Sequence, residues 1–257
     1  MGWTEPFEEF RDKVVVVTGA STGIGAAVAK GFGACKARVI VHANSSVAEG
    51  EAVVAQIVAA GGRARLERAD LSSAEAARSL IERVVAQEGR IDVLINNAGT
   101  IVGRKPTTEV DDAFADYLMD LNFTSLYAAI RAVIPVMKAQ GGGAIVNTTS
   151  IAARMGGGPG TVSYGAAKGA VSSLTRGIAR EFAKDRIRVN AVAPGLIDTP
   201  LHDKLTPPGV IEAMLPGVPM GRIGSPEECV GTYLFLASER LSGYITGQIV
   251  EISGGMV

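Results

Sequence analysis

Short runs of apolar residues recur along the chain, and longer stretches with a helical hydrophobic period separate them. The runs are too uniformly apolar to be strands with one exposed face. Short buried runs that alternate with helices are typical of a parallel sheet covered by helices on both faces. The predicted strands are 14–17, 39–41, 93–95, 144–146, 187–192 and 249–252, and the predicted helices are 26–34, 47–60, 73–88, 111–138, 164–184 and 226–237. The pattern therefore predicts an α/β fold.

The length and the charge of the chain limit its partners. A chain of 257 residues can bury a full core and suits one large α/β domain as well as two small ones. The formal net charge is -1 and the isoelectric point is near 6.2, so we expect neither nucleic acid nor an anionic membrane as a partner. A small neutral or anionic molecule fits this balance better.

Cysteine usage and the first residues bear on location. Cys35 and Cys229 cannot form a disulfide framework, and neither has a second Cys or a His at ligand spacing, which indicates a reducing compartment and no metal site. The chain begins with an acidic segment where a signal peptide would be basic. No uncharged apolar run approaches the roughly 18 residues of a membrane helix. We therefore expect a cytoplasmic protein.

A glycine-rich segment follows the first predicted strand. Gly19, Gly23 and Gly25 lie between this strand and a helix, where the backbone turns sharply and comes close to a ligand. The free N–H groups at the start of the helix suit a phosphate group. The segment predicts a phosphate-binding site, and the alternative is a simple turn.

The same segment contains a second pattern. Gly19-Ala-Ser-Thr-Gly23 satisfies the G-x-S-x-G motif of hydrolases, with Ser21 as the nucleophile. Such an enzyme needs an acid and a histidine further along the chain. Only His42 and His202 exist, and the motif falls on the first strand of the sheet, so hydrolysis is the weaker hypothesis.

Tyr164 and Lys168 lie four residues apart in a predicted helix, so their side chains share one face with Cβ atoms roughly 5–6 Å apart. A free phenol titrates near about 10, and a base that works at neutral pH needs a pKa about three units lower. A lysine about 4 Å away contributes roughly 4 kcal/mol at an effective dielectric of about 20, which is enough. The spacing predicts an acid/base pair. The alternative is an exposed tyrosine beside a solvated lysine.

Several motifs stand together in one order: Thr18-Gly-x-x-x-Gly-x-Gly25, Asn96-Asn-Ala-Gly99, Ser150, Tyr164-x-x-x-Lys168 and Pro194-Gly195. The set closely resembles the classical short-chain dehydrogenase/reductase family, over about residues 12–256. The resemblance implies a single-domain Rossmann-type doubly wound parallel sheet of about seven strands, and hydride transfer between a nicotinamide dinucleotide and a secondary alcohol or ketone without a metal. Residues 1–11 would form an N-terminal extension. Residues 12–257 would form one dinucleotide-binding and catalytic domain, with a substrate lid at about 198–224.

The resemblance also assigns catalytic roles. Tyr164 would exchange a proton with the substrate oxygen, Lys168 would lower the tyrosine pKa and hold the nicotinamide ribose, and Ser150 would orient the carbonyl. Asn122 would relay protons between Lys168 and solvent from a locally distorted helix, and the alternative is an ordinary surface asparagine. Ser150 stands one residue further from Tyr164 than is common in the family, and we expect the glycine-rich turn at 156–160 to take up that residue.

The dinucleotide contacts implied by the resemblance follow the ends of several strands. They are Gly19, Ser21, Thr22, Gly23, Ile24, Gly25, Ala43, Asn44, Ser45, Asp70, Leu71, Asn97, Ala98, Gly99, Tyr164, Lys168, Pro194, Gly195, Ile197 and Thr199. Asp70 has an alternative interpretation as a residue that begins a helix, and Thr199 has one as a loop cap. The second strand ends without an acid to bind a ribose 2′-OH, which favours NADP(H), with NAD(H) as the alternative. Against this, Thr22 stands where NADP-using relatives often have arginine.

The substrate and the assembly are less defined by the sequence. Arg154, His202 and Lys204 near the lid suggest a sugar, a hydroxy acid or a 3-oxoacyl compound, and the alternative is that they are solvated charges. The resemblance implies a homotetramer. A non-catalytic dinucleotide-binding sensor or scaffold is a second hypothesis for the function, although all four catalytic positions carry competent residue types.

Overall fold

The computed structural model describes residues 7–200 and 205–257. Its centre is a parallel sheet of seven strands in the order β3-β2-β1-β4-β5-β6-β7. The strands are β1 (Val14–Val17), β2 (Arg38–Ala43), β3 (Arg63–Arg68), β4 (Val93–Asn96), β5 (Gly143–Thr148), β6 (Ile187–Pro194) and β7 (Ile249–Ile252). The order reverses between β1 and β4, as in a doubly wound Rossmann-type fold. The predicted fold class is confirmed.

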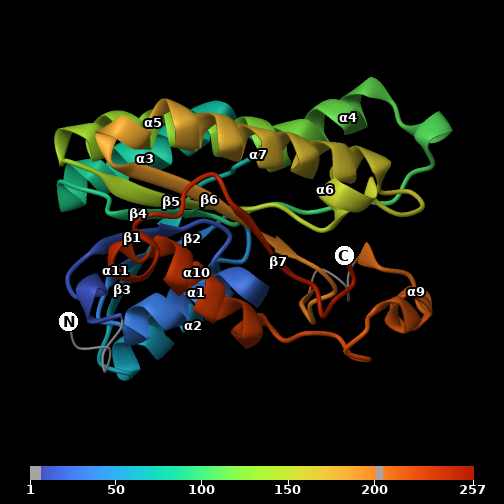
Figure 1. Cartoon of the computed structure of the whole chain (residues 1–257), viewed down its shortest axis with the longest axis horizontal. Coiled ribbons are helices and arrows are strands. Elements are labelled where there is room, and N and C mark those ends of the chain that lie inside the picture. Colours follow the sequence, from blue (N-terminus) through green and yellow to red (C-terminus); the bar gives the residue numbers. More distant parts are fainter. Residues whose placement is uncertain (1–6, 201–204) are drawn as a thin grey trace.

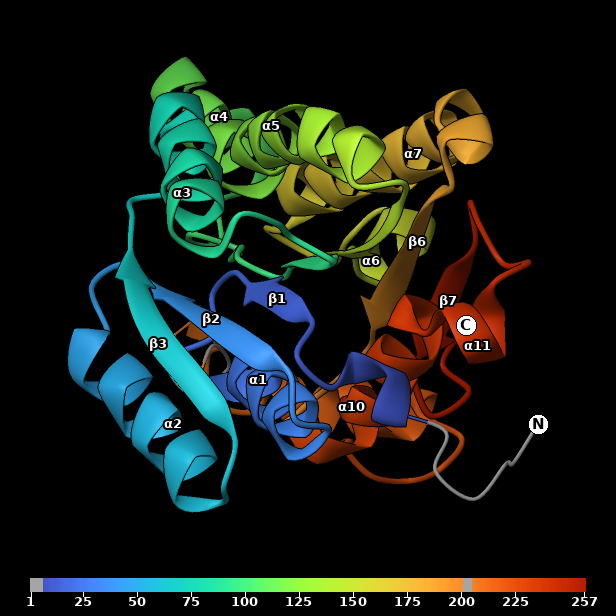
Figure 2. The same cartoon turned by 90° about the vertical axis from the view of Figure 1, so that its left-hand side faces the viewer.

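Long helices cover both faces of the sheet, as Figures 1 and 2 show. On one face lie α1 (Gly23–Ala34), α2 (Val47–Ala59) and α10 (Pro226–Ala237), and on the other lie α3 (Ala74–Glu88), α5 (Ser125–Ala139) and α7 (Val162–Glu181). Val15 and Val17 of β1 join the first core, with Phe32 of α1. Val14 and Val16 join the second core. Because both faces are covered, every residue of β1 is buried and apolar, which explains the uniform run.

The remaining helices are short. They are α4 (Asp112–Met119), α6 (Ala152–Met155), α9 (Val210–Met214) and α11 (Glu239–Ser242), with single 3-10 turns at Glu8–Phe10, Thr107–Glu109, Ala183–Asp185 and Leu215–Gly217. The single helix predicted for 111–138 is wrong, because a π-helical turn over Asp120–Thr124 separates α4 from α5. Among the described helices, none is both long and apolar enough to cross a bilayer.

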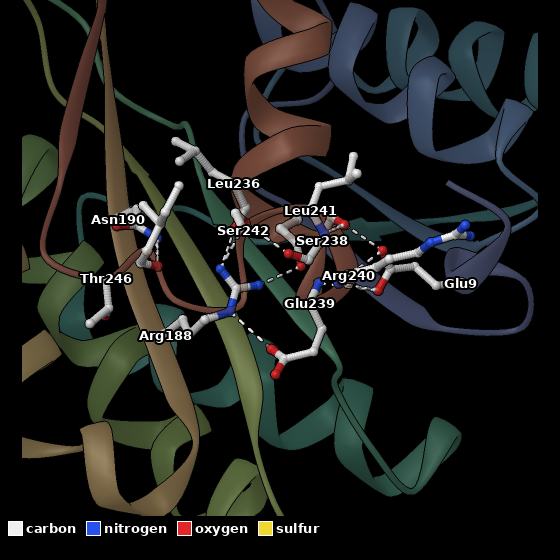
Figure 3. Close-up of polar contacts among 12 residues, drawn as sticks. Glu9, Arg188, Asn190, Leu236, Ser238, Glu239, Arg240, Leu241, Ser242 and Thr246 are labelled. Atoms are coloured by element: carbon white, nitrogen blue, oxygen red, sulfur yellow. Dashed lines mark hydrogen bonds and ion pairs between the residues drawn. The ribbon is translucent and has the colours of Figure 1, made fainter. Parts of the chain in front are cut away.

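A buried arginine lies at the amino-terminal edge of the sheet (Figure 3). Arg188 lies on β6, and its side chain is 8% exposed. Its Nη1 donates to the Leu236 carbonyl at 2.7 Å and to the Ser242 hydroxyl at 3.1 Å, and its Nη2 donates to the Ala237 carbonyl at 2.9 Å. Its Nε donates to Glu239 at 3.1 Å. The guanidinium therefore sits at the C-terminal end of α10, where the helix dipole favours a cation.

The segment before β1 packs against the same edge of the sheet. Glu9 accepts hydrogen bonds from the backbone N–H of Glu239 at 3.1 Å and from that of Arg240 at 3.3 Å, at the start of α11. Phe10 is buried, and its ring meets that of Phe32 edge to face with 5.0 Å between centroids. Residues 7–11 are therefore part of the packed structure.

We expect Arg188→Met to lower the free energy of unfolding by roughly 2–4 kcal/mol, because four hydrogen bonds are lost at a site that water reaches poorly. Urea unfolding followed by circular dichroism measures the change. Arg78→Met, at an exposed position of α3, is the control and should stay within about 0.5 kcal/mol of the parent. Equal midpoints for the two variants would contradict the role given to Arg188.

Candidate active site

Most of the predicted site residues lie at the carboxyl edge of the sheet, at the ends of six of its strands or in the turns that follow them. The other three lie on helices, Asn122 in the π-helical turn and Tyr164 and Lys168 on α7. In parallel α/β sheets, ligands bind outside this edge at the point where the strand order reverses. Here that point is the gap between the ends of β1 and β4. Figure 1 shows the short helices α6 and α9 at this end of the molecule.

The glycine-rich turn after β1 leaves no room for a side chain at Gly19 or Gly25. A Cβ on Gly25 would lie 2.2 Å from the Gly19 carbonyl oxygen and 2.5 Å from Asn97 Nδ2, and Gly19 itself has a φ of +61°. Thr22, at the N-cap of α1, makes no side-chain hydrogen bond to the helix start. The uncapped N–H groups and the glycine surface form a cradle that fits a pyrophosphate. Beside the cradle, Ser21 and Ile24 are half-buried and Thr22 is exposed.

The turn after β4 holds this cradle in place. Asn97 Nδ2 donates to the Thr18 carbonyl at 3.1 Å and to the Gly19 carbonyl at 3.0 Å. The Thr18 hydroxyl accepts the N–H groups of Asn97 at 2.9 Å and of Ala98 at 3.0 Å. Asn97 and Ala98 therefore fix the two central turns of the sheet against each other.

The ends of β2 and β3 meet through Asn44. Its Nδ2 donates to Asp70 Oδ1 at 3.1 Å, and its carbonyl accepts from Arg68 Nε at 3.2 Å. Asp70 also accepts the Ser72 N–H at 3.0 Å, and this bond lowers the pKa of its carboxyl. Asp70 thus orders its own turn and lies beside Asn44. Its alternative interpretation as the residue that begins a helix is wrong, because Ser73 is the N-cap of α3. Of the other predicted contacts here, Ala43 and Leu71 are buried and Ser45 is exposed.

The structure brings Ser150 close enough to the Tyr164 hydroxyl to act on the pKa of the phenol. Ser150 follows β5 and accepts the Ala152 N–H at 3.1 Å, and Tyr164 lies in the first turn of α7. Gly156, Gly157 and Gly160, in the turn before α7 where we expect the additional residue, all have positive φ. The longer spacing therefore does not separate the two hydroxyls.

Lys168 lies one helical turn beyond Tyr164 and is 2% exposed, so the alternative of a solvated lysine is wrong. Its Nζ donates to the Thr148 carbonyl at 2.9 Å and lies 5.7 Å from the centre of the Tyr164 ring. A backbone carbonyl at the end of β5 therefore holds the ammonium near the phenol.

The predicted lowering of the Tyr164 pKa is wrong for the protein without a ligand. Burial raises the pKa of Tyr164 to about 12, and the hydrogen bond from Ser150 acts in the opposite direction without offsetting it. Burial likewise lowers the pKa of Lys168 to about 8. The prediction counted the attraction between the two charges and omitted the cost of removing each from water.

Asn122 is fully buried in the π-helical turn, so its interpretation as a surface residue is wrong and the predicted helix distortion is confirmed. Its Nδ2 donates to the carbonyls of Thr100 and Leu118, both at 2.9 Å, and its Oδ1 accepts the Thr100 N–H at 3.1 Å. A Cβ on Gly99 would lie 2.7 Å from Asn122 Oδ1 and 3.0 Å from Lys168 Nζ. Asn122, Gly99 and Lys168 therefore converge on one point.

The segment that follows β6 forms the last part of the carboxyl edge of the sheet. Pro194 is the last residue of β6, and the Gly195 N–H donates to the Ile252 carbonyl at 2.9 Å. Ile197 forms an isolated parallel bridge with Gly224. A Cβ on Gly23 would lie 3.2 Å from Thr199 Cγ2, so Thr199 reaches the glycine-rich turn.

The two ends of the predicted lid segment are hydrogen-bonded to each other. The Asp198 N–H donates to the Gly224 carbonyl at 2.8 Å, and the Gly224 N–H donates to the Leu196 carbonyl at 3.0 Å. Of the polar substrate candidates, Arg154 pairs with Glu251 at 3.1 Å. His202 and Lys204 lie outside the described residues.

His42 does not serve Ser21 as a base. Its Nδ1 accepts the Gly19 N–H at 3.0 Å, and its Nε2 lies 3.1 Å from the Ala69 carbonyl. Both ring nitrogens are therefore engaged with backbone, which removes the nearest histidine that the hydrolase hypothesis needs. Within the described residues, no three His, Cys, Asp or Glu side chains gather into a potential metal site.

Comparison with known proteins places this geometry in a family. A family model described as enoyl-(acyl carrier protein) reductase matches residues 19–257. A 3-oxoacyl-[acyl-carrier-protein] reductase of Synechocystis sp. is 40% identical over 247 residues, which cover 95% of this chain and 97% of the relative. A solved structure of the NADH-dependent reductase A1-R' complexed with NAD is similar with a TM-score of 0.87 and 36% identity, over 98% of this chain and 99% of that chain. A 3-oxoacyl (acyl-carrier-protein) reductase from Agrobacterium tumefaciens C58 with NADP bound has a TM-score of 0.90 and 33% identity, over 98% and 97% of the two chains.

The Rossmann-type sheet, the glycine cradle and these similarities define a dinucleotide-dependent oxidoreductase. The chain belongs to the classical short-chain dehydrogenase/reductase family, as its motifs predict. It is an NAD(P)-dependent enzyme that acts on CH–OH and C=O groups.

Proposed function

We propose that this protein is a ketoreductase that uses Ser150, Tyr164, Lys168 and Asn122 to reduce a ketone to a secondary alcohol. The observation that carries the proposal is the proximity of Ser150 to the Tyr164 hydroxyl, with the buried Lys168 beside them at the carboxyl edge of the sheet. Two hydroxyl donors that meet at one point suit a carbonyl oxygen, which has two lone pairs to accept them. The glycine cradle after β1 fits the pyrophosphate of a nicotinamide dinucleotide, with Gly19, Gly23 and Gly25 as its floor.

The bound dinucleotide would supply the hydride to the carbonyl carbon. As the hydride arrives, negative charge develops on the substrate oxygen, and the Ser150 and Tyr164 hydroxyls stabilise it by hydrogen bonds. Tyr164 then gives its proton to that oxygen. The Lys168 ammonium stabilises the phenolate left behind and restores its proton, and we propose that Asn122 holds the path by which Lys168 is reprotonated from solvent.

The titration behaviour of the pair suits a proton donor. Because burial raises the pKa of Tyr164 to about 12, the phenol carries its proton at neutral pH and is ready to act as an acid. Oxidation of an alcohol would need the phenolate first. The pKa of Lys168, lowered to about 8, leaves this group able to release a proton to its neighbour and take one up again.

We propose 3-oxoacyl thioesters as the substrate class, because several relatives that match nearly the whole chain are 3-oxoacyl-[acyl-carrier-protein] reductases. The test is a panel of 3-oxoacyl thioesters, keto sugars, keto acids and simple diketones, each mixed with the protein and either NADPH or NADH while the reduced-nicotinamide absorbance is followed. Turnover confined to the sugars or acids would exclude the thioester class. Dinucleotide binding without turnover on any carbonyl would favour the sensor, and esterase activity without dinucleotide binding would favour the Ser21 hydrolase.

We propose NADP(H) as the preferred cofactor over NAD(H), with Arg68 as the partner of the 2′-phosphate. The Arg68 guanidinium is held against the turn after β2 by its bond to the Asn44 carbonyl, and Arg68 is exposed. Among the described residues, no acid forms an ion pair with it. Arg68 would thus supply the positive charge that NADP-using relatives often place at the position of Thr22. It was missed as a functional residue because β3 was not predicted.

Arg68→Gln should reduce kcat/KM for NADPH by roughly 10–100-fold and leave kcat/KM for NADH nearly unchanged, because a charge-assisted bond to phosphate contributes about 1.5–3 kcal/mol. Arg63→Gln is the matched control, since Arg63 begins the same strand and pairs with Asp12 at the opposite edge of the sheet. An unchanged ratio between the two cofactors would show that Arg68 does not read the phosphate.

We further propose a homotetramer that works in the cytoplasm and closes the 198–224 segment over its substrate. The helices α5 and α7 lie side by side on the outer face (Figure 2), and family members often assemble through the corresponding helices. Sedimentation velocity tests the assembly, and a monomer at working concentrations would exclude it.

A further inference from the structure

The strongest unused feature of the site is the buried histidine between two of its turns. His42 lies on β2 and is 2% exposed, and no step of the proposed reaction uses it. A histidine in a closed core has to satisfy both ring nitrogens, since a buried polar atom without a hydrogen-bond partner is destabilising. The bonds that it makes therefore determine what it does.

Only one form of the ring satisfies both bonds. The Gly19 N–H donates to Nδ1 at 3.0 Å, so Nδ1 carries no proton. Nε2 lies 3.1 Å from the Ala69 carbonyl, which can only accept, so Nε2 carries the proton. His42 is thus neutral and protonated on Nε2, and a second proton on Nδ1 would face the Gly19 N–H without an acceptor.

Each partner of the ring belongs to a segment of the proposed cofactor site. Gly19 begins the glycine-rich turn, and Ala69 immediately precedes the Asp70-Leu71 turn. The peptide groups of Gly19 are held on both sides, because its N–H meets His42 and its carbonyl accepts from Asn97 Nδ2 at 3.0 Å. His42 also fixes the next residue, since the Ala20 N–H donates to the His42 carbonyl at 2.8 Å.

The charges that act on the ring come from the neighbouring β3 and α3. Burial lowers the pKa of His42 most strongly, Arg83 of α3 acts in the same direction, and Glu67 and Asp70 of the β3 side oppose them. The neutral ring is therefore the form present at neutral pH. At lower pH, protonation would remove the acceptor for Gly19 and release the first residue of the cradle.

We propose that His42 is a positioning residue for the dinucleotide: its neutral ring links the turn after β1 to the turn after β3, and cofactor affinity falls when that link is protonated or removed. The proposal rests on the proposed function for the identity of the ligand. The turnover of the saturated enzyme should not depend on this link, because among the described residues the His42 ring bonds to Gly19 and Ala69 and makes no hydrogen bond to Ser150 or Tyr164.

The test compares two variants with a matched control. His42→Leu keeps most of the volume and removes both bonds, whereas His42→Asn keeps, at the position of Nδ1, an acceptor for the Gly19 N–H. The control is Asn190→Leu. Asn190 is a fully buried residue on β6 whose side chain also links two backbone segments, by donating to the Ile245 carbonyl at 2.9 Å and accepting the Gln248 N–H at 3.0 Å (Figure 3).

Titration with ADP-ribose, followed by intrinsic fluorescence or calorimetry, is the direct measurement. We expect His42→Leu to raise the Kd roughly 10-fold, with kcat at saturating cofactor within about threefold, and His42→Asn to recover most of the affinity. Asn190→Leu should lower the melting temperature and leave the Kd unchanged. Equal Kd values for the parent and a folded His42→Leu variant would overturn the proposal, as would a His42→Asn variant as weak as His42→Leu.

The pH dependence gives an independent readout that needs no folded His42→Leu variant. Because the folded protein disfavours a proton on His42, the Kd of the parent for ADP-ribose should rise as the pH falls below the ordinary histidine range, and the Kd of His42→Asn should rise less. Identical pH profiles for the two proteins would overturn the proposal. ADP-ribose lacks the 2′-phosphate, whose own titration would otherwise enter the profile. A parent protein that binds neither ADP-ribose nor a dinucleotide would overturn the proposed function as well.

Discussion

Replacing Tyr164 with Phe should lower kcat by roughly 10²–10⁴-fold, the range typical of a lost general acid, and leave the Kd for NADPH within about twofold. The change removes one oxygen atom from the first turn of α7 and leaves the ring in place. What is lost is the proton that Tyr164 would give to the substrate oxygen and one of the two hydroxyls that meet there. The glycine cradle, which lies after β1, is untouched.

The measurement is single-turnover reduction of a substrate from the carbonyl panel, with NADPH binding followed in parallel by fluorescence. Tyr244→Phe is the matched control, because the Tyr244 side chain is fully exposed at 104% relative accessibility. This control should keep parent activity. If Tyr164→Phe keeps near-parent turnover, Tyr164 is not the proton donor and the proposed mechanism is wrong.

The sequence was most informative where both faces of an element are buried. The bounds predicted for β1 and α10 agree with the structure, because a uniform apolar run and a proline-started helix are hard to mistake. The bounds predicted for β7 agree as well, although this edge strand is only partly buried. Motif spacing was also sufficient to bring Ser150 and Tyr164 together, since the end of β5 and the start of α7 are fixed by the sheet. Hydrophobic periodicity therefore located most of the edge on which the candidate site lies.

The strand β3 was missed because it does not look buried in sequence. Residues 63–68 read Arg-Ala-Arg-Leu-Glu-Arg, and charged residues alternate with others along an edge strand. Their charges are satisfied by partners distant in sequence, as in the bond between Arg83 Nε and Glu67 at 3.2 Å. An edge strand stabilised by ion pairs has no apolar signature, so Arg68 could not be placed near the cofactor site from sequence alone.

Two finer features depend on atomic surroundings that a sequence does not contain. The Ser-x-x-Glu pattern at Ser72 and Glu75 predicts a capping box at the start of α3, but Ser73 is the N-cap, and its hydroxyl accepts the Ala76 N–H at 3.3 Å. The Tyr164 pKa depends on how completely the phenol leaves water, which spacing between two residues does not reveal. The spacing of Tyr164 and Lys168 therefore predicted the right partners but the wrong direction of the Tyr164 pKa shift.

Replacing Gly25 with Ala should weaken dinucleotide binding by at least about 100-fold, because the new Cβ would lie 2.2 Å from the Gly19 carbonyl oxygen and 2.5 Å from Asn97 Nδ2. The first of these atoms is backbone and cannot rotate away. To make room, the glycine-rich turn must separate from the start of α1, and Asn97 must give up a bond that holds Gly19. Both changes act on the cradle proposed for the pyrophosphate.

Gly177→Ala is the control for Gly25→Ala, since a Cβ on Gly177 of α7 has no atom within 4 Å. There the added methyl group should raise the free energy of unfolding by up to about 1 kcal/mol through helix propensity and leave the Kd unchanged. ADP-ribose titration and thermal unfolding of the two variants measure the contrast. Parent-like affinity in Gly25→Ala would mean that the close approach of Gly25 to Gly19 does not shape the ligand site, and that the cofactor is held elsewhere on the carboxyl edge.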